Sequence, residues 1–123
     1  MKKTVHKVAV LGSGVMGSGL ACLFANIGME VLLLDIPPSN LNQEEEEAGL
    51  SLDSPEVRNR IVRDSFRHVV ESSPAPLYKK EFAERVRLGN IDDDLGDIGQ
   101  YDWVLEAIVE DLQNYIYVAR EQI

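Results

Sequence analysis

The fold of this chain is decided by residues 7–35, which have the sequence KVAVLGSGVMGSGLACLFANIGMEVLLLD. A short apolar run at 8–11 predicts a first strand, and a glycine-rich turn follows it. The next residues have helical periodicity from about position 15, and a second apolar run at 31–34 ends on an aspartate. This order predicts a strand, a helix and a second, parallel strand.

The glycines of this stretch have the spacing of a dinucleotide-binding turn. Gly12 would permit a tight turn after the strand, and Gly14 lacks the Cβ that would keep the backbone away from a pyrophosphate. Gly17 would let the helix pack close to the sheet. Because the helix begins near Val15, its unpaired N–H groups and positive dipole end would face the phosphates. Asp35 follows at about the spacing of the acid that binds the adenosine ribose.

The first helix should have two kinds of surface. Its larger apolar residues recur at helical spacing: Met16, Leu20, Leu23, Phe24 and Ile27. Its small residues, Gly17, Ala21 and Ala25, should allow a close approach to the sheet. For Cys22, in the same helix, a buried and unreactive thiol is favoured over a reactive one.

Composition and charge narrow the class of protein. The 123 residues suffice for one domain but are few for a complete six-stranded Rossmann fold. The net charge of -9 repels nucleic acid and anionic membrane, so we expect neither as a partner. The single cysteine fits a reducing compartment, and the sequence has no recognisable signal peptide or membrane-spanning run. We therefore predict a cytoplasmic location.

The segment 36–54 is too charged to be core, and its run 44–47 consists of four glutamates. A solvated loop or a frayed helical turn is expected there rather than a cation site, because consecutive like charges repel one another. Ser54 and Pro55 form a helix start, and the helix should continue to about residue 72. Its expected buried residues are Val57, Ile61, Val62, Phe66, Val69 and Val70.

A basic stripe lies along this second helix. Arg60, Arg63 and Arg67 are spaced three and four residues apart. Two interpretations remain open, a solvated face that balances the surrounding acids and a phosphate-binding site.

The rest of the chain continues the alternation of helices and strands. The expected elements are a helix at 77–84, a strand at 86–88, a helical turn near 94–98, a strand at 103–107 and a helix at 112–122. Asp92, Asp93 or Asp94 should cap the helical turn. The predicted fold class is α/β: a truncated Rossmann-type three-layer fold with a mainly parallel sheet and a helical hairpin inserted after the second strand.

Motifs of several other enzyme classes are missing. The sequence contains no G-x-x-x-x-G-K-[ST], no G-x-S-x-G and no H-E-x-x-H. The aspartates near 92–97 lack the further ligands of a coordination shell, so no metal is predicted. His6 and His68 have no matched acid nearby in sequence and are expected to be incidental.

Three features together resemble one enzyme family: the stretch VAVLGSGVMGSGLACLFANIGMEVLLLD, the long helical hairpin after it, and YDWVLEAIVED at 101–111. They resemble the NAD-binding domain of 3-hydroxyacyl-CoA dehydrogenases, including the dehydrogenase part of the multifunctional fatty-acid oxidation proteins. The resemblance implies a pyrophosphate site at Gly12, Gly14, Val15, Met16 and Gly17 and a ribose site at Asp35. It further implies that Ile108, Val109 and Glu110 line the nicotinamide half of NAD.

The same resemblance implies an acyl-CoA substrate and a homodimer for the full-length enzyme. In the family, the helix after the second strand approaches coenzyme A, so Arg60 and Arg67 become candidate phosphate-binding residues. An acid at position 35 also disfavours a 2′-phosphate, so NAD is expected rather than NADP.

Two departures from the family limit what can be carried over. Tyr115 stands where the family has a lysine, and the catalytic histidine and its glutamate partner have no counterpart in this chain. We expect residues 1–123 to be the N-terminal NAD-binding domain of a longer enzyme that oxidises 3-hydroxyacyl-CoA to 3-oxoacyl-CoA, and to be inactive alone. The alternatives are another NAD-linked β-hydroxyacid dehydrogenase and a non-catalytic NAD-sensing module.

Overall fold

The computed structural model describes residues 5–107, which are organised around a parallel β-sheet. Its strands are β1 (Lys7–Leu11), β2 (Glu30–Asp35), β3 (Val86–Asn90) and β4 (Trp103–Glu106). They lie in the order β3-β2-β1-β4, and Val8 of β1 is level with Val31 and Trp103 on the two neighbouring strands. All the predicted strands are present, and β3 extends beyond the predicted 86–88 to Asn90.

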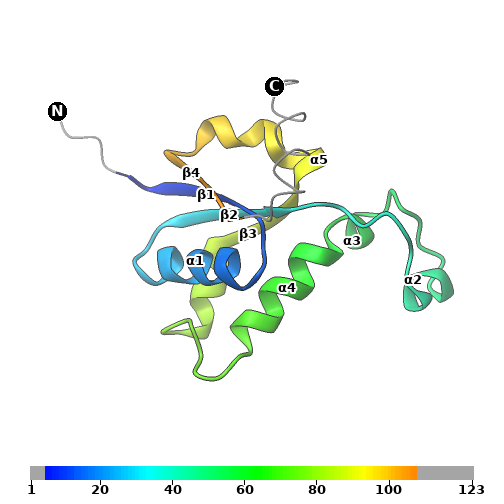
Figure 1. Cartoon of the computed structure of the whole chain (residues 1–123), viewed down its shortest axis with the longest axis horizontal. Helices are drawn as coiled ribbons and strands as arrows, with labels where there is room; N and C mark the ends of the chain where they lie inside the picture. Colours follow the sequence, from blue (N-terminus) through cyan, green and yellow to red (C-terminus); the bar gives the residue numbers. More distant parts are fainter. Residues whose placement is uncertain (1–4, 108–123) are drawn as a thin grey trace.

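Helices cover both faces of the sheet (Figure 1). They are α1 (Val15–Asn26), α2 (Gln43–Glu47), α3 (Pro55–Arg58), α4 (Arg60–Val70), the 3-10 helix η1 (Lys80–Arg85), α5 (Ile91–Asp94) and the 3-10 helix η2 (Leu95–Gln100). Helices α1 and α4, with η1, lie against one face, and α5 and η2 lie against the other. This arrangement confirms the predicted three-layer fold and the helical insertion after β2. None of the helices within residues 5–107 is long and apolar enough to cross a membrane.

The hydrophobic core has two parts, one on each face of the sheet. The part under α1 and α4 contains the strand residues Val8, Val10, Val31 and Leu33. The part under α5 and η2 contains the alternate strand residues Ala9, Leu11, Leu32 and Leu34. Because both faces are covered, the strands are continuous apolar runs rather than alternating ones.

Helix α1 packs on the sheet through its small residues, as predicted, but its larger apolar residues do not form the expected buried stripe. The buried residues include Gly17, Ala21, Cys22, Phe24 and Ala25. Met16, Leu23 and Ile27 are exposed instead. The helix lies so close to the sheet that mainly small side chains fit beneath it. Burial also raises the pKa of the Cys22 thiol, in agreement with the expected unreactive thiol.

The single helix predicted from 54 to 72 is wrong, because the chain leaves helical geometry at Asn59 and forms α3 and α4. The Asn59 side-chain oxygen accepts a hydrogen bond from Nδ2 of Asn90 at 2.9 Å. Asn90 is buried, and it caps α5 by accepting a hydrogen bond from N of Asp93 at 2.9 Å. The aspartate cap was predicted for the turn that forms η2. Asp94 occupies the N-cap position of η2, but its side chain makes no capping hydrogen bond there. Of the expected core residues, Val57, Val62 and Phe66 are buried, whereas Ile61, Val69 and Val70 are half-buried.

The acidic run does not lie wholly in solvent as expected, because it forms the capped helix α2. The N–H of Glu45 donates to the Asn42 side chain at 2.8 Å, and the N–H of Asn42 donates to the Glu45 carboxylate at 2.9 Å. Glu45 is 6% exposed and also forms an ion pair with Arg60 of α4. One glutamate of the run therefore fixes α2 to α4.

Three other predicted elements differ in form or cannot be compared. The segment predicted as a helix at 77–84 is the shorter 3-10 helix η1. The turn expected near 94–98 is the 3-10 helix η2, which directly follows α5. The helix predicted at 112–122 lies outside the described residues.

An ion pair joins α3 to α5 beside the end of β3. Nε of Arg58 lies 2.7 Å from Oδ2 of Asp93. The hydrogen bonds from Arg58 and Asn90 hold the pKa of Asp93 below its usual range. A lowered carboxyl pKa stabilises the fold above the pKa of the unfolded chain, and this contribution is lost as the pH falls through the folded-state value.

We expect Arg58→Leu to lower the free energy of unfolding at neutral pH by less than about 1 kcal/mol, because the Asp93 side chain is 51% exposed and solvent screens the pair. The loss should shrink at a pH below the lowered folded-state pKa of Asp93, where Asp93 is protonated in both proteins. Urea unfolding at the two pH values measures this, and NMR titration of the Asp93 carboxyl should show its pKa rising in the variant. An equal loss of stability at both pH values would contradict the expectation.

Candidate cofactor site

The turn between β1 and α1 is held tightly by its glycines. Gly12 has a φ of 102°, which residues with a side chain rarely adopt, and its N–H donates to the Leu34 carbonyl at 2.7 Å. A Cβ on Gly17 would overlap the carbonyl oxygen of Gly12, so α1 starts directly against the turn. The tight turn and the close packing predicted at these two glycines are both present.

The first residues of α1, in contrast, are exposed and have open space beside them. A Cβ on Gly14 would have no atom within 4 Å, which leaves room for a ligand to approach the backbone. Val15 and Met16 are 79% and 72% exposed. The N–H of Ser18 donates to the Gly14 carbonyl at 2.9 Å, so the N–H groups of the three residues before it have no acceptor within the helix. Such a helix start fits the pyrophosphate of a dinucleotide.

Asp35, at the end of β2, is buried against the turn. Its Oδ2 accepts hydrogen bonds from N and Oγ of Ser13, at 2.8 and 2.5 Å. Its Oδ1 accepts a hydrogen bond from N of Ile36 at 2.7 Å. On the other side of the turn, Oγ of Ser18 donates to the Ser13 carbonyl at 2.6 Å. The carboxylate predicted to meet a ribose is therefore ordered by the turn itself.

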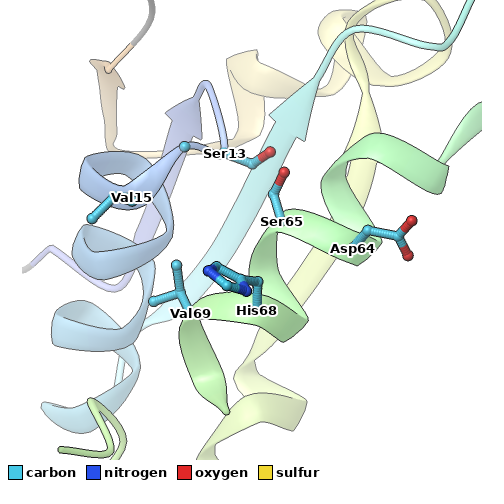
Figure 2. Close-up of a pocket in the computed structure, with 7 residues that line it drawn as sticks. Ser13, Val15, Asp64, Ser65, His68 and Val69 are labelled. Atoms are coloured by element: carbon cyan, nitrogen blue, oxygen red, sulfur yellow. The ribbon is translucent and has the colours of Figure 1, made fainter. Parts of the chain in front are cut away.

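A cavity of about 340 Å³ lies between this turn and α4 (Figure 2). The turn and the start of α1 contribute Ser13, Gly14 and Val15, and α4 contributes Asp64, Ser65, His68 and Val69. Figure 2 shows the Ser65 hydroxyl and the His68 ring directed toward the turn, whereas the Asp64 carboxylate points away. A cavity of this size can hold part of a dinucleotide or of a similar ligand.

Ser65 and His68 were missed as site residues from the sequence. They lie three positions apart on α4, so they share one helical face. That spacing was visible in the sequence, but the packing of this face beside the turn depends on a contact between α1 and α4 that no local pattern reveals. His68 lines the cavity, and the expectation that it has no catalytic role stays a prediction.

The structure gives Arg60 and Arg67 different surroundings. Arg60 pairs with buried Glu45 and donates from Nη2 to the Asn40 carbonyl at 3.1 Å, so its guanidinium holds the insertion together. The Arg67 side chain is 62% exposed and lies 3.2 Å from the Asp64 carboxylate one turn earlier. Their predicted role in binding coenzyme A stays a prediction.

Ile108, Val109 and Glu110, the predicted nicotinamide-side residues, lie outside the described residues. The last described residue, Ala107, donates from its N–H to the Leu11 carbonyl at 2.8 Å. The end of β4 is thus beside the end of β1, where the glycine turn begins. Within residues 5–107, no cluster of histidine, cysteine and acidic side chains is placed to hold a metal ion.

A family model described as the NAD-binding domain of 3-hydroxyacyl-CoA dehydrogenase matches residues 7–115. The chain belongs to this family. The match confirms the family resemblance noted above and the prediction that the cofactor is NAD. It covers the glycine turn, Asp35, the helical insertion and the end of the sheet in one continuous segment.

Comparison with individual proteins gives the same family. A probable 3-hydroxyacyl-CoA dehydrogenase of Bacillus subtilis is 47% identical over 113 residues, and a putative fatty acid oxidation complex trifunctional enzyme of Rickettsia felis is 36% identical over 113 residues. Each alignment covers 92% of this chain but only 14% of the relative. A solved structure of a diketoreductase is 23% identical to this chain, with a TM-score of 0.52. The match covers 94% of this chain and 37% of the diketoreductase chain, and it supports the fold alone.

Proposed function

We propose that this chain is the NAD-binding N-terminal domain of a longer enzyme that oxidises 3-hydroxyacyl-CoA to 3-oxoacyl-CoA. The observation that carries the proposal is the glycine turn, fixed by buried Asp35 and open toward a cavity under α4. Two further findings support this proposal. The chain belongs to the family, and its alignments cover only 14% of the length of two relatives. The base that takes the hydroxyl proton would lie in a part of the enzyme beyond these residues.

Bound NAD would supply the acceptor for the hydride of the substrate carbon. The N–H groups at the start of α1, around Gly14, would hold the pyrophosphate without any lysine. Asp35 would accept a hydrogen bond from the adenosine ribose, and its charge would oppose a 2′-phosphate. Ile108, Val109 and Glu110 would line the nicotinamide half of the crevice.

Coenzyme A would lie along α4, which forms the side of the cavity opposite the glycine turn. Arg67 is the better placed of the two predicted arginines, because its exposed guanidinium has only a surface pair with Asp64 to give up. Arg60 would reach a phosphate only by releasing Glu45 and the Asn40 carbonyl. For the longer enzyme we also propose a homodimer, as the family resemblance implies, and a cytoplasmic location, which the single cysteine supports.

We expect this chain to bind the cofactor and only the longer protein to catalyse the reaction. The 123-residue chain should bind NAD but should not oxidise NADH in the presence of acetoacetyl-CoA. The polypeptide encoded by the complete gene should oxidise NADH with this thioester, which the loss of NADH absorbance measures. Turnover by residues 1–123 alone, or NAD binding without turnover by the complete polypeptide, would contradict the proposal. The second outcome would favour a non-catalytic NAD-sensing module.

The same assay tests the coenzyme A contact. Arg67→Gln in the complete polypeptide should raise KM for acetoacetyl-CoA by about tenfold, since one charge-assisted phosphate contact is lost. KM for the acetoacetyl thioester of pantetheine, which has no phosphate, should stay unchanged. An equal change for both thioesters would place the effect elsewhere than at the phosphates.

A further inference from the structure

The strongest unexplained feature of the cofactor site is how the Asp35 carboxylate is held. Asp35 is 7% exposed, and Ser13 is fully buried. Ser13 donates twice to the same oxygen of Asp35, from its amide at 2.8 Å and from its hydroxyl at 2.5 Å. The amide contact needs only the backbone at this position, whereas the hydroxyl contact depends on the side chain.

The hydrogen bonds leave Asp35 little freedom. A carboxylate oxygen accepts about two hydrogen bonds in its plane. Within residues 5–107, both positions on Oδ2 are taken by Ser13, and one position on Oδ1 is taken by the N–H of Ile36. Oδ1 therefore has one position left for a ribose hydroxyl. Because both oxygens are held, the carboxylate cannot turn away from a ligand without breaking these hydrogen bonds.

We propose that Ser13 is a positioning residue that sets the preference for NAD over NADP by holding the Asp35 carboxylate at the ribose. This inference rests on the proposed binding of the adenosine ribose at Asp35. A 2′-phosphate is repelled only while the carboxylate stays beside it, and a carboxylate free to rotate about its side-chain bonds would relieve the repulsion. The Ser13 hydroxyl opposes that rotation, so it strengthens discrimination through its hydrogen bond to Asp35.

The inference predicts a change in the ratio of two affinities. NMR titration of the full 123-residue chain with NAD and with NADP gives both dissociation constants, and the spectrum of each variant shows whether it is folded. Ser13→Ala should lower the preference for NAD by about three- to tenfold, the size expected when one charge-assisted hydrogen bond stops ordering a group. Ser13→Gly, which removes the Cβ together with the hydroxyl, should lower the preference to the same extent.

Ser18→Ala is the matched control. It removes a second buried hydroxyl, in the first turn of α1, that donates to the Ser13 carbonyl at 2.6 Å instead of to Asp35. This variant should weaken NAD and NADP binding alike and leave their ratio unchanged. An equal fall of the ratio in Ser18→Ala and Ser13→Ala would mean that the turn as a whole, and not the carboxylate, sets the preference, and would overturn the inference.

Asp35→Asn separates this inference from the function on which it rests. If Asp35→Asn leaves the ratio unchanged, the proposed ribose contact itself fails. If Asp35→Asn lowers the ratio but Ser13→Ala and Ser13→Gly do not, only the role of Ser13 fails. The double variant Ser13→Ala/Asp35→Asn should have the ratio of Asp35→Asn alone, and a further fall would show that Ser13 does not act through Asp35.

Discussion

Gly17→Ala should destabilise the domain by about 3 kcal/mol or more, because the added Cβ would overlap backbone that cannot move independently of β1. The atom in its way is the carbonyl oxygen of Gly12, a residue whose own conformation and hydrogen bond to Leu34 are fixed. To accept the methyl group, α1 would have to lift away from the sheet and from the turn. Urea unfolding followed by circular dichroism measures the loss of stability, and NAD binding should fall with it.

Gly19→Ala is the matched control, two residues further along the same helix. A Cβ at Gly19 would have no atom within 4 Å, so the substitution adds a better helix former without a clash. It should stabilise the domain by about 0.5–1 kcal/mol. Similar unfolding curves for the two variants would show that α1 is not packed against the turn as the structure describes.

Arg60→Leu should lower the free energy of unfolding by about 2–3 kcal/mol, because it leaves a buried carboxylate without its partner. Glu45 is 6% exposed and its ion pair with Arg60 connects α2 to α4. The Arg60 side chain is 18% exposed, so the loss should lie below that for a completely buried pair. Urea unfolding measures the total effect, and faster amide hydrogen exchange in residues 43–47 should show that α2 is released first.

Arg67→Leu serves as the comparison on the same helix. The Arg67 side chain is 62% exposed and its ion pair with Asp64 is open to water, so its removal should change stability by less than about 0.5 kcal/mol. The double variant Arg60→Leu/Glu45→Gln should be less destabilised than the sum of its single variants. Strict additivity would mean that the two side chains act separately.

The strands and the turn could be predicted from sequence because their signals are local. Strand β2 is a continuous apolar run that ends at Asp35, and the glycines at 12 and 17 follow β1 at fixed spacing. The orientation of α1 could not be predicted in the same way, since apolar residues occur all around it. Met16 is exposed and Ala21 is buried because the helix lies too close to the sheet for long side chains, and that distance is a property of the assembled fold.

In the candidate cofactor site, the sequence identified single residues but not the hydrogen bonds that connect them. Asp35 was identified from its spacing, but its hydrogen bonds with Ser13 join residues 22 positions apart. The same is true of the Glu45–Arg60 pair, which gives a buried place to a glutamate in a run that looks fully solvated. Local patterns report which residues can form an element, whereas these contacts depend on which elements meet.

The break in the helix at Asn59 bears on how quickly a ligand can enter the cavity. Asn59 binds buried Asn90 of β3, Arg58 pairs with Asp93, and Phe66 is buried in the core, so α4 is attached to the sheet near its beginning and along its length. We therefore expect α4 to be a fixed side of the cavity and not a moving cover. The rate of NAD association should therefore be limited by diffusion and orientation, with no slow conformational step before binding.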